Sequence, residues 1–138
     1  MKISKTDHSW MRLAVKQALT APHDKWKVGA VLVRGGSLLS TGVNRYRNDP
    51  ALVQIGDVSY HAEAVVLSKA GDARGATIYI ARIAKSGVLA MAKPCARCQE
   101  LLLENGIGTI LYTSGFTEVQ KLRARYVSDQ DWTEDLPT

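Results

Sequence analysis

His61-Ala62-Glu63 and Pro94-Cys95-Ala96-Arg97-Cys98 are the two stretches around which this chain is organised. The second stretch holds both cysteines of the sequence. Zinc prefers thiolate sulfur and imidazole nitrogen, and catalytic zinc sites use three protein ligands and leave one position open. His61, Cys95 and Cys98 therefore predict a site for one Zn2+ per chain. Glu63 lies two residues from the histidine, where a carboxylate is a candidate for proton transfer.

The apolar pattern around these stretches predicts a mixed α/β domain. Helices are predicted over 6–20, from about 60 to 70, over 95–105 and, shorter, near 117–124. Strands are predicted over 27–34, 38–44, 76–82 and 107–113. Two strands followed by strand–helix alternation predict a sheet with helices packed on it. We expect one domain over residues 1–138 that ends in an acidic tail at about 126–138, with residues 124–127 as the only candidate for a fifth strand and residues 83–93 as a loop.

The two cysteines lie three residues apart at the predicted start of a helix, so both thiols project to one side of its first turn. The partial positive charge of a helix N-terminus favours thiolates there. Three other interpretations remain open. A thioredoxin-like redox pair has the same Cys-x-x-Cys spacing but leaves His61 and Glu63 unexplained. A structural zinc site needs a fourth ligand, for which His8 and His23 are the remaining histidines. A binding module would keep the fold and the metal without turnover.

Composition places the chain among ordinary globular proteins. Of its 138 residues, 46% are hydrophobic, and no apolar run reaches the roughly 18 residues that a membrane span needs. The first residues lack the apolar region of a signal peptide. Two closely spaced cysteines without an export signal favour a reducing interior, and we expect a cytoplasmic protein.

The net charge of +5 is unevenly distributed. Four acidic residues and no lysine or arginine lie in residues 126–138, so the first 125 residues carry +9, from 18 basic and 9 acidic side chains. A basic body attracts phosphate groups, whether free or in nucleic acid. The same charge is equally consistent with a solvated surface that has no site.

His-x-Glu followed by Pro-Cys-x-x-Cys is the established signature of zinc-dependent nucleobase deaminases. On these residues the sequence resembles the cytidine/deoxycytidylate deaminase superfamily. Residues 27–33 are similar to the first strand of that family and residues 41–44 to the end of its second strand, so the resemblance covers roughly residues 10–114. A histidine as the first ligand is more like the deoxycytidylate and nucleic-acid deaminases, because the small cytidine deaminases usually carry a cysteine there.

The resemblance implies a three-layer α/β/α fold with a mixed five-stranded sheet. It implies a hydrolase that converts a cytosine nucleotide or nucleoside to the uracil product plus ammonia, with Glu63 moving the protons. The alternative substrate is cytosine or adenine in single-stranded DNA or RNA, which requires an unpaired base and contacts to its neighbours. The short chain has little insertion with which to build a groove for a strand. Relatives are commonly dimers or larger rings, so we expect a homo-oligomer.

Substrate contacts are predicted at Asn44, Gly29, Ala30, Ala62, Trp26, Arg45 and Tyr112. Asn44 resembles the asparagine that binds the sugar hydroxyl, although asparagine also favours turns. A glycine inside a strand indicates the close approach of another group. At Gly29 that group is the pyrimidine ring if the resemblance holds, and otherwise the glycine marks a bulge.

The remaining contacts rest on weaker signals. The resemblance implies that the backbone carbonyl of Ala62 accepts from the exocyclic amine. Arg45 could meet a phosphate or be solvated. Trp26 and Tyr112 could stack on a base, or lie in the core or at the rim of the site.

Overall fold

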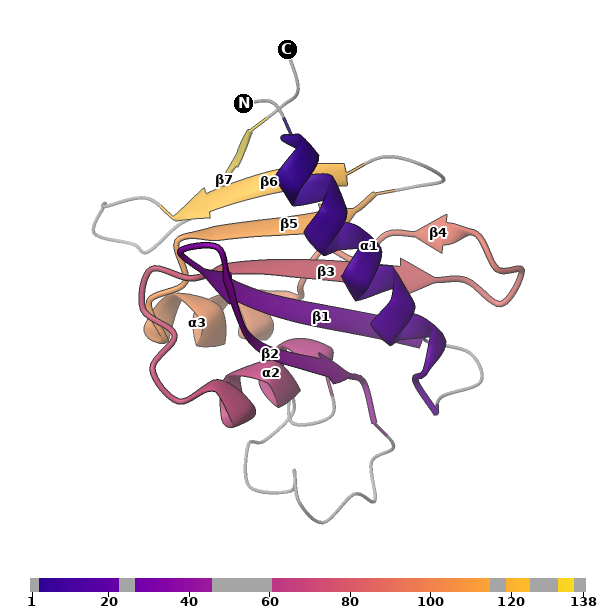
Figure 1. Cartoon of the computed structure of the whole chain (residues 1–138), viewed down its shortest axis with the longest axis horizontal. Coiled ribbons are helices and arrows are strands. Elements are labelled where there is room, and N and C mark those ends of the chain that lie inside the picture. The colour runs from indigo at the N-terminus through magenta and orange to yellow at the C-terminus, as the bar shows by residue number, and fades with distance from the viewer. Residues whose placement is uncertain (1–2, 23–26, 46–60, 115–118, 125–131, 136–138) are drawn as a thin grey trace.

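A computed structural model describes residues 3–22, 27–45, 61–114, 119–124 and 132–135. These residues form three helices and seven strands (Figure 1). The helices are α1 (Lys5–Leu19), α2 (Ala62–Ala70) and α3 (Ala96–Glu104). The strands are β1 (Lys27–Arg34), β2 (Ser37–Val43), β3 (Thr77–Ile83), β4 (Leu89–Ala90), β5 (Thr109–Thr113), β6 (Val119–Ala124) and β7 (Trp132–Asp135). No helix in these ranges is long and apolar enough to span a membrane.

The strands form one mixed sheet in the order β2-β1-β3-β5-β6-β7, with β4 paired to β3. The β1–β2 hairpin turns at Gly35 and Gly36, which both have positive φ, a conformation that glycine adopts without steric cost. β3 and β5 run parallel, with Thr77 opposite Thr109, and the connection between them carries α3. The other pairs are antiparallel. The predicted three-layer class and mixed sheet are confirmed: β1, β2, β3, β5 and β6 are its five longer strands.

Helices cover both faces of the sheet (Figure 1). Alternation along β1 divides the core, because successive side chains of a strand point to opposite faces. Ala30 and Leu32 pack with α2 and α3 in one apolar cluster, whereas Val31 and Val33 pack with α1 in the other. The stretches with the predicted metal ligands lie at the starts of α2 and α3, so the candidate site belongs to the face opposite α1.

One prediction about the C-terminal part is wrong. Residues 119–124 of the segment predicted as a short helix near 117–124 form strand β6, with Val119 opposite Thr113 of β5. β6 is one of the five longer strands, and it ends at Ala124, the first residue of the predicted strand candidate 124–127, whose other residues lie outside the described part of the chain. A helix of this length is marginal by itself, whereas the open edge of β5 offers a complete ladder of backbone hydrogen bonds. The predicted 83–93 loop is also wrong in part, because Leu89–Ala90 forms β4. Within the acidic tail, Trp132–Asp135 forms β7.

The start of α1 is fixed by a network of polar side chains. Ser4 and Asp7 form a capping box, and the Tyr79 hydroxyl donates to Asp7 Oδ1 at 2.6 Å. Lys121 Nζ lies 3.7 Å from Asp7 Oδ2. Burial raises the pKa of Asp7, but the hydrogen bonds from Tyr79 and Ser4 and the charge of Lys121 outweigh it and hold that pKa below its ordinary value. The network ties α1 to strands β3 and β6.

Candidate metal centre

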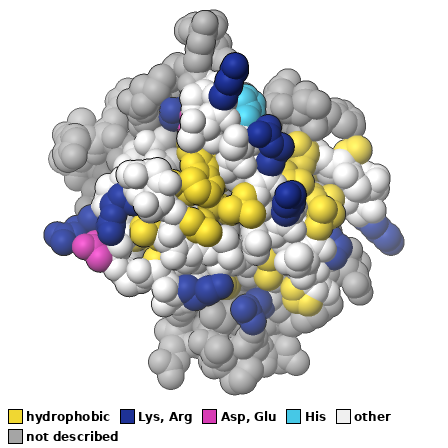
Figure 2. Space-filling model, in the orientation of Figure 1, with side chains coloured by type: hydrophobic (Ala, Val, Ile, Leu, Met, Phe, Trp, Pro, Cys, Tyr) yellow, Lys and Arg dark blue, Asp and Glu magenta, His cyan; other side chains and the backbone are white. Residues whose placement is uncertain are grey.

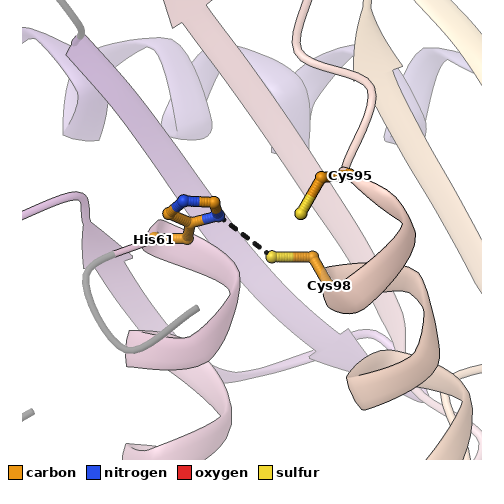
Figure 3. Close-up of side chains that lie close together, drawn as sticks. All are labelled: His61, Cys95 and Cys98. Atoms are coloured by element: carbon orange, nitrogen blue, oxygen red, sulfur yellow. Dashed lines mark hydrogen bonds between the residues drawn. The ribbon is translucent and has the colours of Figure 1, made fainter. Parts of the chain in front are cut away.

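His61 and Cys95 are the N-cap residues of α2 and α3, and neither side chain makes a hydrogen bond that caps its helix. N-cap positions usually carry Ser, Thr, Asp or Asn, whose oxygen accepts from the first free amides. Here the two cap side chains point instead toward each other's helix (Figure 3). The two helices therefore begin close together, each with a candidate metal-ligand side chain at its N-cap position.

The three predicted ligands converge (Figure 3). His61 Nδ1 lies 3.1 Å from Cys98 Sγ, and one ligand atom from each of His61, Cys95 and Cys98 lies within 4.8 Å of the other two. In the described part of the chain this is the only group of three or more His, Cys, Asp or Glu side chains arranged to hold a metal ion. His8, a possible fourth ligand, is exposed on α1 across the sheet, and His23 lies outside the described residues.

The environment of the thiols fits a cation. Cys98 is fully buried, and its burial, followed by the charge of Glu63, raises the pKa of its thiol. A thiolate at this position therefore needs a positive charge beside it, and a coordinated zinc ion supplies one. A simple redox pair of cysteines would not require the contact between His61 and Cys98. The donor set of two sulfurs and one imidazole is the type that zinc prefers.

Glu63 occupies the first turn of α2, two residues beyond His61, and is only 5% exposed. Burial raises the pKa of its carboxyl group, and its own backbone N–H, the charge of His61 and a hydrogen bond from Cys98 oppose this without overcoming it. Glu63 thus lies at the ligand cluster without being one of its three members. A buried carboxyl group with a raised pKa can hold a proton and release it, which is the property of a general acid and base.

Asn44 follows β2 and is buried, at 8% exposure. Its side-chain Oδ1 accepts from the backbone N–H of Val28 at 2.9 Å, and the backbone N–H of Asn44 donates to Val28 O at 3.1 Å. The amide is therefore held in one orientation against β1. Sequence reasoning missed the partner because the contact is to backbone, which leaves no signal in the side-chain pattern. Its sugar-binding role remains a prediction.

Gly29 does make a close approach, but to α1. A Cβ at this position would lie 2.3 Å from both Ala14 O and Ala18 N. The glycine is therefore needed on the face of the sheet that packs against α1, and no contact with a pyrimidine is required to explain it. A backbone contact of Gly29 with substrate remains a prediction.

The other predicted contacts are placed as follows. Ala30 and Ala62 are fully buried in the cluster that packs with α2 and α3, on the face of the metal centre. Tyr112 belongs to the same cluster and is 1% exposed, so its ring is covered and offers little surface for stacking. Arg45 is exposed and follows Asn44 directly, whereas Trp26 lies outside the described residues.

Comparison with protein families agrees with this geometry. Residues 4–114 match the family described as the cytidine and deoxycytidylate deaminase zinc-binding region, and both halves of the ligand set lie within the match. The chain belongs to this deaminase family. Zinc is thus the metal of the family, and His61, Cys95 and Cys98 are the residues that would hold it here. No curated protein sequence matches the chain.

Several solved structures share the deaminase fold. A cytidine deaminase from Burkholderia pseudomallei is 22% identical, with a TM-score of 0.62, and the match covers 84% of this chain and 91% of that one. The dCMP deaminase of cyanophage S-TIM5 is 20% identical, with a TM-score of 0.58 over 83% and 86% of the two chains. RibD from Acinetobacter baumannii is 26% identical, with a TM-score of 0.56 over 80% of this chain. The chain matches 28% of the length of RibD.

Proposed function

We propose that the chain is a zinc-dependent hydrolase that converts a cytosine nucleotide or nucleoside to the uracil product plus ammonia. The observation that carries the proposal is the burial of Glu63 beside the cluster of His61, Cys95 and Cys98. A purely structural metal site does not require a buried, protonatable carboxyl group such as that of Glu63 in addition to its ligands. The S-TIM5 dCMP deaminase, which shares the fold, was solved in complex with dCMP and dUMP, and this supports pyrimidine nucleotides as the first substrates to test.

The proposed chemistry assigns the proton transfers to Glu63. Bound zinc supplies a Lewis acid that lowers the pKa of water toward 7. Glu63 accepts the proton that the attacking water loses and passes it to N3 of the base, while a C4–O bond forms. Glu63 then accepts the proton of the new C4 hydroxyl group and delivers it to the exocyclic amine, so that the C4–N bond breaks as the C4=O bond forms and ammonia leaves. One carboxyl group performs all these transfers when each atom lies within its hydrogen-bond distance.

A second part of the proposal is that the substrate carries a phosphate, as deoxycytidylate or cytidylate does. The first 125 residues carry +9, and Figure 2 shows lysine and arginine side chains spread over the α1 face, which lies across the sheet from the candidate metal centre. This general charge attracts anions without fixing their position. Arg45 is the specific candidate, since it is exposed and follows the predicted sugar contact Asn44. Arg47, the other arginine close to Asn44 in the sequence, lies outside the described residues.

The substrate class is tested by measuring ammonia release from deoxycytidine, deoxycytidylate and a short single-stranded oligonucleotide. The zinc-loaded protein is assayed at two salt concentrations. We expect the highest kcat/KM for deoxycytidylate, with a moderate fall at higher salt because exposed charges are screened. A preference for the nucleoside would contradict the phosphate proposal. A preference for the oligonucleotide with a steep salt dependence would favour the nucleic-acid alternative.

Arg45→Ala separates a phosphate contact from general attraction. A charge-assisted hydrogen bond contributes about 1.5–3 kcal/mol, so the KM for deoxycytidylate should rise at least about tenfold while that for deoxycytidine stays unchanged. Arg12→Ala is the matched control, because it removes the same charge from an exposed position on α1 across the sheet. Equal effects of the two variants would show that only overall charge matters.

The family resemblance also supports a homo-oligomer. Light scattering coupled to size-exclusion chromatography tests this at assay concentrations, and a monomeric mass would contradict it.

A further inference from the structure

The two cysteines of the metal centre are held in different ways. Cys98 is fully buried and packs against Ala64 and Leu101 of the α2–α3 contact. Cys95 is exposed, and as the N-cap of α3 it makes no capping hydrogen bond with its side chain. Packing therefore fixes the Cys98 thiol but not the Cys95 thiol. Something other than apolar contact has to set the direction of the Cys95 side chain.

Gln99 holds the backbone on both sides of Cys95. Its side-chain Nε2 donates to Pro94 O at 2.9 Å, and its backbone N–H donates to Cys95 O at 2.9 Å. These two carbonyl groups belong to the peptide units that precede and follow the Cys95 Cα. When both planes are fixed, the φ and ψ of Cys95 are fixed as well, and with them the direction of its Cα–Cβ bond. The backbone bond is that of any α-helix, whereas the side-chain bond depends on residue 99 being able to donate.

We propose that Gln99 is a positioning residue of the metal centre: its side-chain amide orients Cys95 for zinc by holding the carbonyl of Pro94. The inference rests on the zinc site of the proposed function. Groups that orient metal ligands without touching the metal typically change affinity by 10–100-fold when they are mutated. The sequence carries no direct sign of this role, because a glutamine one turn into a helix is most simply interpreted as a solvated residue.

The test compares Gln99→Met with Glu100→Met. Methionine keeps the length and the helix propensity of glutamine but cannot donate to Pro94 O. Glu100 is the exposed neighbour on α3 and serves as the matched control. Zinc affinity is measured by competition with a chelator at neutral pH. We expect the dissociation constant to rise 10–100-fold for Gln99→Met and to stay within about twofold of wild type for Glu100→Met.

Two further measurements separate positioning from a general loss of stability. Cobalt-loaded Gln99→Met should show weaker thiolate-to-cobalt absorption than the loaded wild type, because Cys95 contributes less to the site. Urea unfolding of the metal-free proteins should show nearly equal stability, since the contact matters mainly when the ligand has to be in place. Reduced metal-free stability with unchanged zinc affinity would overturn the proposal in favour of a merely structural role.

Gln99→Glu provides a second test should the methionine variant fail to fold. Its ionised carboxylate has the same length and cannot donate to a carbonyl, so zinc affinity should fall at least as far as in Gln99→Met. Unchanged affinity in both variants, with a wild type that binds zinc, would refute this inference alone. A wild type that binds no zinc would instead refute the proposed metal centre.

Discussion

Gly29→Ala should destabilise the fold and leave the chemistry of the folded molecules intact. The new Cβ would lie 2.3 Å from Ala14 O and from Ala18 N, whereas Cβ contacts below 3.0 Å essentially never occur. Helix α1 would therefore have to move by at least 0.7 Å, the difference between these two distances. Both obstructing atoms are backbone, so no side chain can rotate away. Overpacking usually costs about 1–3 kcal/mol, and we expect the upper end, about 3 kcal/mol.

A loss of this size is large against a total stability of roughly 5–15 kcal/mol. It should lower the Tm by roughly 10 °C, which calorimetry or circular dichroism can measure. Gly108→Ala is the matched control, because the nearest atom to its Cβ is Ala76 O at 4.0 Å. Activity per folded molecule should change little in either variant. If Gly29→Ala had a normal Tm but a raised KM, the close approach at this glycine would be that of the substrate and the reasoning from α1 would be refuted.

Three other predictions concern the metal centre and the network at α1. Glu63→Gln should keep zinc and the fold but lower kcat by at least about 10²–10⁴-fold, the usual contribution of general acid–base catalysis, and near-normal turnover in the zinc-loaded variant would contradict the role. Removal of metal by a chelator, or His61→Ala, should abolish activity, and metal analysis should find about one zinc per wild-type chain. A Cys95–Cys98 disulfide and no bound metal in a zinc-replete preparation would contradict the site. Asp7→Asn should reduce stability near neutral pH and make its loss in acid shallower. The pKa of Asp7 is lowered in the folded state, so its contribution is present above its ordinary pKa of about 3.9 and is lost as the pH falls through the lowered value. An unchanged acid limb in urea-unfolding data at several pH values would contradict this.

The ligand set could be predicted from the sequence because its chemistry is local. Cys95 and Cys98 are three residues apart, so their common side of α3 follows from helix geometry. His61 and Glu63 have a similar fixed relation at the start of α2. The hairpin at residues 35–36 and the strand over 27–34 are local in the same sense, and the structure confirms both.

For the residues outside this ligand set, only the tertiary structure decided which groups they contact. The glycine at position 29 indicates a close neighbour. Whether that neighbour is a substrate or α1 depends on the face of β1 to which position 29 belongs, and a shift of one residue in the strand register reverses that face. β6 formed in place of a predicted helix because the edge of β5 was free to pair with it. The bonds from Val28 to Asn44 and from Gln99 to Pro94 involve backbone groups that every residue carries. Local spacing was thus enough to predict the candidate ligands. The contacts that support them join segments that come close together only once the chain has folded.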